Sequence, residues 1–176
     1  LFISTNHAGL EIYSNPQLKP ESGWSSESGI KQGVKTGKWM GYIDVAGFIQ
    51  QYEDMMEFSF GQWGTSGEYD GMGFKSVNVG KTRITGVELS VSGQGEITPD
   101  LTINIIAGYT YMNPISLELD SVYAHYISGR EITYRNSGSD STMLKYRYKH
   151  IAKGDLEIVY KGISLGGSVR YNSFMK

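Results

Sequence analysis

The stretch LKYRYKHIAKGDLEIVY, residues 144–160, alternates charged side chains with apolar or aromatic ones along most of its length. This twofold alternation predicts a β-strand, because successive side chains of a strand point to opposite faces of its sheet. We predict a strand over 143–160 with one charged and one apolar face. The charged face holds Lys145, Arg147, Lys149, Lys153, Asp155 and Glu157, and the apolar face holds Leu144, Tyr146, Tyr148, Ala152, Leu156, Ile158 and Tyr160.

Five further segments show the same alternation. The predicted strands span 24–35, 39–60, 74–97, 101–112, 143–160 and 163–171. In each strand, polar side chains share one face and apolar side chains share the other. Outside 143–160, the charged side chains assigned to the polar face are Glu27, Lys31, Asp44, Glu88 and Arg170.

The connections between these segments alternate strictly between short and long. Tight turns are predicted at 35–38, 97–100 and 161–162, and long connections at 61–73 and 113–142. In an antiparallel sheet, this pattern places every short turn at one end and every long loop at the other. Such asymmetry, with strands of about ten or more residues, is typical of an outer-membrane β-barrel. Strands of ordinary sheets are shorter, usually about 5–6 residues.

Tyr and Trp side chains lie near the ends of the apolar runs. Trp39 stands beside a short turn, and the rings toward the long loops are Tyr109, Tyr111, Tyr146 and Tyr148. Rings at both levels fit the aromatic girdles of a membrane protein. A charged face is tolerated only beside water or other polar groups. We therefore expect the apolar face to contact lipid and the charged face to line the polar interior of a barrel.

Two residues do not fit this assignment. Lys81 and Arg83 share the parity of apolar Val87 and would point toward lipid. Either a bulge near Gly86 reverses the register, or both side chains lie above the membrane among charged headgroups. We favour the second interpretation.

The composition favours one all-β domain and excludes several functions. The chain has 176 residues with 23 Gly and 13 Tyr, and 39% of its residues are hydrophobic, a composition of strands and turns rather than helices. A net charge of −2 argues against a nucleic-acid partner. Without Cys, disulfides, thiolate metal sites and a cysteine nucleophile are excluded. The three His lack the spacing of metal ligands, so we expect neither a metal nor another cofactor. Because residues 1–3 resemble no signal sequence, we expect an internal fragment.

Two short motifs resemble catalytic or nucleotide-binding patterns, but their surroundings favour strands. Residues 162–166 read G-x-S-x-G, yet 167–171 alternate as a strand and no His follows. NVGKTR at 78–83 ends like a phosphate-binding loop, but Lys75 stands where the first Gly is required. We therefore predict that the protein is not an enzyme.

The stretch NPQLKPESGWSSESGIKQG, residues 15–33, resembles the N-P-x-L-K-P-E…E-x-G segment of TonB-dependent outer-membrane receptors. Three later stretches look like successive barrel strands of that family: DVAGFIQQYEDMMEF (44–58), VNVGKTRITGVELSVSG (77–93) and LTINIIAGYTYMNP (101–114). Gly-Val-Glu-Leu at 86–89 is similar to its recurring G-[VIA]-E-[LF]. The resemblance is closest to receptors of Bacteroidetes. The Lys of LKPE is more typical of conventional receptors than of the glycan-importing branch.

The resemblance implies that residues 1–176 are about six strands of a larger plugged barrel of the 22-stranded kind. The plug domain, TonB-box and final strand would lie outside this sequence. Such receptors import a scarce ligand, namely an iron chelate, cobalamin, a glycan or a peptide, with energy from TonB. The resemblance implies the outer membrane of a Gram-negative bacterium, with long loops extracellular and short turns periplasmic. A passive porin-like channel and a soluble all-β binding domain are the alternatives.

The implied partners follow from the same resemblance. They are TonB, reached through the N-terminal region, outer-membrane lipids including lipopolysaccharide, the cargo, and a surface lipoprotein as a candidate. The basic row over 145–153 allows two interpretations, an anion path or a salt-bridge lattice with carboxylates of the plug or neighbouring strands. We favour the lattice.

Recognition on a rigid barrel is expected on its loops. The ligand-binding candidates are Tyr52, Glu53, Asp54, Trp63, Tyr69 and Asp70 in and beside loop 61–73, and Tyr123, His125, Tyr126 and Arg130 in loop 113–142. Stacking rings with carboxylates suit a sugar, a cation or a metal chelate. The alternative is that these side chains only pack the loops over the barrel mouth.

Overall fold

The computed structural model describes residues 10–65, 70–137 and 142–175. The chain divides into two compact units. The sheet unit comprises Ser25–Gln50, Ile84–Pro114 and Tyr146–Lys176, and the loop unit comprises Leu1–Trp24, Gln51–Arg83 and Ile115–Lys145. Almost all of both predicted long connections falls in the loop unit.

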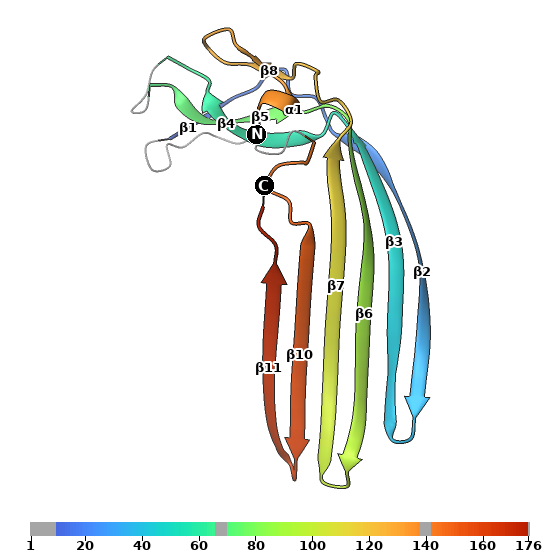
Figure 1. Ribbon diagram of the computed structural model, residues 1–176. Coiled ribbons are helices and arrows are strands. Elements are labelled where there is room, and N and C mark those ends of the chain that lie inside the picture. The colour runs from blue at the N-terminus through green and yellow to red at the C-terminus, as the bar shows by residue number, and fades with distance from the viewer. Residues whose placement is uncertain (1–9, 66–69, 138–141, 176) are drawn as a thin grey trace. The chain divides into compact units, whose positions relative to one another are not determined.

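The sheet unit is built on a six-stranded sheet. Its strands are β2 (Ser22–Thr36), β3 (Trp39–Glu53), β6 (Thr82–Thr98), β7 (Leu101–Ser116), β10 (His150–Tyr160) and β11 (Ile163–Asn172). They lie in the order β11-β10-β7-β6-β3-β2, and neighbouring strands run in opposite directions (Figure 1). The prediction of an all-β fold with six long antiparallel strands is confirmed.

Two-residue turns join these strands in pairs. They lie at 37–38, 99–100 and 161–162. Lys161 and Gly162 both have positive φ, 47° and 81°. That combination is the type I′ geometry, whose twist matches the flanking strands. All three predicted turns are confirmed.

The G-x-S-x-G motif belongs to the last of these hairpins. Ser164 lies in β11 and donates a hydrogen bond to Glu157 Oε1 on β10, at 2.8 Å. Gly166 pairs directly with the same Glu157. A nucleophile elbow requires a sharp turn from strand to helix, so this motif is a strand pattern.

The polar face of the sheet carries the charges that alternation assigned to it. Lys153 pairs with Arg170 across β10 and β11. Directly opposite residues of an antiparallel pair point to the same face. By the same pairing, Asp155 faces Ser168, and Glu157 accepts a hydrogen bond from Asn104 of β7 at 2.8 Å.

The same face continues across the other strands. Lys31 Nζ lies 3.5 Å from Asp44 and 4.0 Å from the centre of the Tyr42 ring. Thr110 of β7 donates to Glu88 of β6 at 3.4 Å. A groove of about 320 Å³ on this face is bordered by Glu27, Asp44, Glu88 and Lys153.

The opposite face is apolar and exposed. Leu156 and Ile158 pair with Ile105 and Ile103 of β7. At the edge of the sheet, Leu165 is 75% exposed. A continuous exposed apolar surface marks contact with lipid or with protein. These side chains do not form the compact core that a soluble β domain would need.

An aromatic ring covers the sheet near a short turn. Trp39, at the start of β3, lies over Gly93 and Gly95 of β6, where a side chain at either glycine would collide with its indole ring. Glycines under an aromatic side chain let the ring lie flat on a sheet. This is the position expected of a girdle residue at the short-turn end.

A second aromatic group lies toward the other end of β7. The Tyr109 hydroxyl is 2.7 Å from His150 Nδ1, and the Tyr111 and His150 rings are 5.3 Å apart. Rings with polar tips suit the interface between hydrocarbon and water. Of the rings expected at this level, Tyr109 and Tyr111 lie in β7 with His150 beside them, whereas Tyr146 and Tyr148 precede β10.

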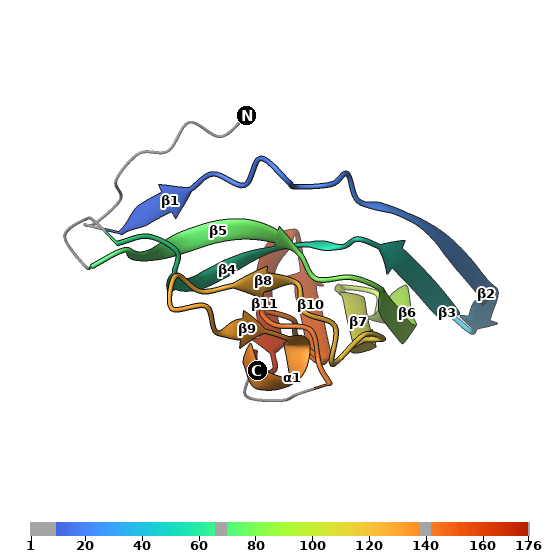
Figure 2. The same ribbon diagram turned by 90° about the horizontal axis from the view of Figure 1, so that it is seen from above.

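The loop unit has a small sheet and its own buried core. β4 (Met56–Gln62) and β5 (Met72–Asn78) form an antiparallel pair, and β1 (Glu11–Tyr13) adds to β5 in parallel. The short β8 (Ala124–His125) pairs with β9 (Glu131–Ile132), followed by the one-turn helix α1 (Tyr134–Ser137) (Figure 2). Buried side chains here include Met55, Val77, Val79, Ile132, Tyr134, Met143 and Leu144.

Two predicted strands were too long. The segment 39–60 breaks into β3 and β4 at Asp54, whose φ is 50°, and the segment 74–97 breaks into β5 and β6 at Gly80, whose φ is 83°. Left-handed backbone at these residues cannot continue a strand. The breaks coincide because Met55 N–H donates to the Gly80 carbonyl at 3.0 Å and Val79 N–H to the Met55 carbonyl at 2.7 Å.

The predicted strand 143–160 was also too long, because β10 begins only at His150. Leu144 is fully buried in the loop unit and Tyr146 has a φ of 57°. The burial of Leu144 places the chain up to Lys145 in the loop unit. The prediction that Lys145 continues the charged row of β10 is therefore wrong, and Arg147 and Lys149 lie before the strand rather than in it, although the Lys149 carbonyl still accepts from the Met112 N–H of β7 at 2.9 Å.

Lys81 and Arg83 belong to the loop unit. Lys81 Nζ lies 3.2 Å from Glu53, and Arg83 donates to the Gln51 side chain at 3.2 Å. Both cations thus have polar neighbours, which supports a position outside the hydrocarbon. Within the described residues, no helix is long and apolar enough to cross a membrane.

Neighbouring residues of β11 allow a test of the lipid-facing assignment at one depth. We expect Val169→Lys to destabilise the membrane-inserted protein by about 2–4 kcal/mol, since the side chain would enter hydrocarbon, whereas Ser168→Lys, on the polar face, is tolerated. Urea unfolding in lipid vesicles measures the difference. Val169 is 71% exposed and Ser168 is also exposed, so equal stability of the two variants would contradict the assignment.

Candidate ligand-binding site

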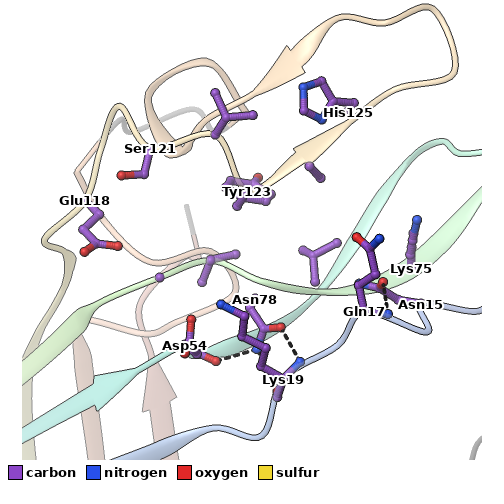
Figure 3. Close-up of a pocket in the computed structure, with 15 residues that line it drawn as sticks. Asn15, Gln17, Lys19, Asp54, Lys75, Asn78, Glu118, Ser121, Tyr123 and His125 are labelled. Atoms are coloured by element: carbon purple, nitrogen blue, oxygen red, sulfur yellow. Dashed lines mark hydrogen bonds between the residues drawn. The ribbon is translucent and has the colours of Figure 1, made fainter.

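The loop unit contains a cavity of about 570 Å³ (Figure 3). This volume lies within the ~300–1,000 Å³ of typical ligand pockets. Four parts of the chain form it: the segment before β2, Asp54 in the bend after β3, the β5 strand with the bend that follows it, and the segment 118–125. Its polar lining residues are Asn15, Gln17, Lys19, Asp54, Lys75, Asn78, Glu118, Ser121, Tyr123 and His125.

The segment before β2 is fixed to the small sheet by side-chain hydrogen bonds. Asn15 donates to the Ser76 carbonyl at 2.9 Å. Asn78 accepts from the Lys19 N–H at 2.8 Å and donates to the Lys19 carbonyl at 3.0 Å. Glu21 accepts from the first backbone N–H of β4 at 2.9 Å. Asn15 and Glu21 of the NPQLKPE motif therefore hold this wall of the cavity in place.

Two carboxylates border the cavity near the bend after β5. Asp54 occupies the left-handed bend after β3, and its carbonyl accepts from the Asn78 side chain at 2.7 Å. Glu118 accepts from the Lys81 N–H at 3.2 Å and packs so closely on Gly80 that any side chain there would collide with it. Gly80 is thus required by its φ of 83°, which residues with a side chain rarely adopt.

The β8–β9 hairpin supplies the opposite wall. Tyr123 N–H donates to the Ile132 carbonyl at 3.0 Å, and His125 pairs with Glu131. The Tyr123 hydroxyl donates to Ser137 Oγ at 2.9 Å. Burial raises the pKa of Tyr123 above its ordinary value, so its ring remains neutral at physiological pH.

A buried polar network supports this wall. The fully buried Tyr134 donates to Glu57 Oε1 at 2.8 Å and accepts from the Lys145 N–H at 3.0 Å. Burial, followed by the negative charge of Glu57, raises the pKa of Tyr134 far above its ordinary value. Burial lowers the pKa of Lys145, and Glu57 opposes that shift. Lys145, predicted to line the barrel interior, instead lies half-buried beside this network.

The structure brings three of the predicted ligand-binding residues together. Asp54, Tyr123 and His125 all line the cavity. Trp63 and Tyr126 form a separate aromatic pair with ring centres 5.3 Å apart. That pair is linked to the cavity through Lys75, whose Nζ lies 5.4 Å from the centre of the Trp63 ring.

The other candidates lie elsewhere in the loop unit. The Tyr52 ring occupies the space next to Gly23 that a side chain at that position would need. Glu53 forms the ion pair with Lys81. Asp70 has a φ of 52° and occupies the turn before β5, and Arg130 is exposed in the turn between β8 and β9. Of these, none borders the cavity among the described residues. Tyr69 lies outside the described residues.

Sequence reasoning missed most of the cavity's polar lining. Asn15, Gln17 and Lys19 belong to the NPQLKPE stretch, which in the sequence indicates only a family resemblance and no ligand-binding residues. Lys75 and Glu118 lie in segments far apart in the sequence, and no local pattern signals that they meet. Within the described residues, no three His, Cys, Asp or Glu side chains gather closely enough to hold a metal ion.

An exposed apolar face, a charged opposite face, two-residue turns at one end and large connections at the other define a transmembrane β-barrel segment. Comparison with protein families agrees: residues 3–175 match the family described as TonB dependent receptor-like, beta-barrel. The chain belongs to this family of outer-membrane receptors and transporters, which are not enzymes. A search of curated proteins found no match.

Removing the Tyr134 hydroxyl tests the buried network. We expect Tyr134→Phe to destabilise the loop unit by about 1–3 kcal/mol, since Glu57 loses a donor and the Lys145 N–H loses its acceptor. Hydrogen exchange of residues 117–137 in the membrane-embedded protein measures the effect. Protection equal to that of the wild type would show that the network contributes nothing.

The raised pKa of Tyr134 predicts a pH dependence. The folded state favours the neutral phenol, so its contribution is complete below pH ~10 and is lost as pH rises above that ordinary pKa. We expect wild-type protection of the loop unit to fall as pH rises above ~10, and to fall less in Tyr134→Phe. The comparison isolates Tyr134, because Tyr123 and Lys145 are present in both proteins. An identical decline in the two would contradict the assignment.

Proposed function

We propose that this chain forms part of the barrel of an outer-membrane receptor that imports a scarce nutrient with energy supplied through TonB. The match to the TonB-dependent receptor barrel over residues 3–175 carries the proposal. The asymmetry of the connections supports an orientation in which the loop unit faces the outside and the two-residue turns face the periplasm.

The edges of the sheet support a larger barrel. Within the described residues, β2 and β11 each have a partner on one side only. Hydrocarbon does not tolerate an open edge, because its backbone N–H and C=O groups would lack partners. We infer that further strands close the barrel, on the scale of the 22-stranded plugged barrels, and that a plug domain and a TonB-box accompany it.

The polar face of the sheet then borders the barrel interior. Its charges are Glu27, Lys31, Asp44, Glu88, Lys153, Asp155, Glu157 and Arg170. The Lys31–Asp44 pair supports a lattice of charge interactions with the plug rather than an open path for anions. The apolar face contacts outer-membrane lipids, including lipopolysaccharide, and the loop-unit cavity contacts the cargo, with a surface lipoprotein as a candidate partner.

A growth experiment tests energised import. A bacterial strain lacking this receptor is compared with the complemented strain on limiting iron chelates, cobalamin, glycans and peptides. We expect the receptor to support growth on at least one of these, and the benefit to disappear when TonB is removed. Receptor-dependent growth that persists without TonB would indicate a passive porin-like channel instead.

A further inference from the structure

The neutral polar groups of the cavity are largely engaged within the protein. Asn15 donates to the Ser76 carbonyl and accepts from the Gln17 N–H at 3.2 Å. The Asn78 amide binds Lys19 with both its oxygen and its nitrogen, and also binds Asp54. These amides fix the walls, so a ligand is recognised by the remaining groups.

The remaining groups are mainly charged. Asp54, Glu118, Lys19 and Lys75 all line the cavity, and in the described part of the chain none of them forms an ion pair with another residue. Lys75 is instead directed over the Trp63 ring. Charges of both signs that share a pocket without neutralising one another are complementary to a ligand that itself carries both charges.

The charges are separated along the cavity. In Figure 3, Asp54 and Glu118 lie toward one side, whereas Lys75 and His125 lie toward the other. Lys19 lies on the same side as Asp54, so its positive charge offsets one of the two negative charges at the acidic end. The acidic end therefore has an excess of one negative charge, and the Lys75 ammonium gives the basic end a positive charge.

We propose that this cavity binds a short linear peptide with free termini, its ammonium group at Asp54 and Glu118 and its carboxylate at Lys75 and His125. The inference rests on the proposed function, since it names the cargo class of the same receptor. Tyr123, between the two ends, offers a neutral aromatic surface to the peptide backbone or its side chains.

The length of the peptide follows from the strand that forms the floor. The basic end lies at Lys75 and the acidic end at Gly80, five residues further along β5 and its bend. Extended chain rises about 3.3 Å per residue, so the ends are at most roughly 16 Å apart. An extended peptide spans about the same distance per residue. About three to five peptide residues therefore fit between the ends.

Other cargo classes fit these groups less well. A neutral glycan is held chiefly by amide and hydroxyl groups, and both cavity asparagines are already engaged. An anionic iron chelate would meet two carboxylates at one end. A cationic ligand would meet Lys75 at the other. The charge separation therefore favours the zwitterion.

Capped peptides test the proposal on the full-length receptor in detergent. Isothermal titration calorimetry compares tetra-alanine having free termini with its N-acetylated and C-amidated forms, and with maltotetraose. We expect tetra-alanine to bind and each cap to weaken binding about tenfold or more, as expected when one charge-assisted contact is lost. Equal affinity for free and capped peptides, no peptide binding, or tighter binding of maltotetraose would each overturn the proposal.

Two variants test which end of the cavity binds the amino terminus of the peptide and which binds its carboxyl terminus. In Glu118→Gln we expect N-acetylation to have little further effect while C-amidation still weakens binding. In Lys75→Gln the pattern should reverse. Glu53→Gln and Arg130→Gln change the same charges outside the cavity and should discriminate between the peptides as the wild type does. Heat-modifiable electrophoretic mobility verifies that each barrel is folded. If both cavity variants respond to both caps as the wild type does, the proposed orientation is wrong.

The failure of this inference is distinguishable from that of the proposed function. TonB-dependent growth on a chelate, cobalamin or a glycan, without peptide binding, would overturn the peptide proposal and leave energised import intact. Peptide binding that depends on both termini, combined with uptake that needs no TonB, would support the peptide site and contradict energised import.

Discussion

The backbone hydrogen bonds between strands are the constraint on which the rest of this structure depends. In hydrocarbon, a peptide group finds no water, so each strand must be paired along its whole length. That requirement selects long, continuous strands such as β6 and β7, and it selects two-residue turns that keep neighbouring strands in register. The same requirement explains why the sheet can expose side chains on both faces. Its fold is determined by main-chain pairing, with hydrocarbon beside one face and water beside the other.

The loop unit, in contrast, depends on buried side chains rather than on backbone pairing. Its short strands and single helical turn could not persist through backbone pairing alone, and they are stabilised by buried side chains such as Tyr134, Leu144 and Val77. The hydroxyl of Tyr134 connects Glu57 to the backbone of Lys145, so polar and apolar burial act together. The loop unit thus has an ordinary protein core, whereas most described side chains of the sheet unit are exposed or half-buried.

Alternation in the sequence was sufficient to predict the six strands, their turns and their faces, because a period of two is a local property. The prediction failed where the chain passes from the sheet unit into the loop unit. Asp54 and Gly80 end the long strands through left-handed backbone, and the continuing alternation on either side gave no sign of this. Leu144 kept the parity of β10, although burial against distant residues places it in another unit. The cavity was predictable only in part: Asp54, Tyr123 and His125 stood out as loop residues, whereas Lys75 and Glu118 meet through tertiary contacts that no spacing encodes.

The hydrogen bonds of the Asn15 and Asn78 side chains, which fix the segment before β2 to β5, have a consequence for how such proteins diverge. They hold the cavity wall by main-chain and amide contacts, so the wall does not depend on the side-chain charges of Lys19 and Lys75. Substitutions of those charges can therefore alter cargo preference while insertion into the bilayer proceeds unchanged. Novel specificities would arise in the loop unit, while the lipid-embedded sheet stays unchanged.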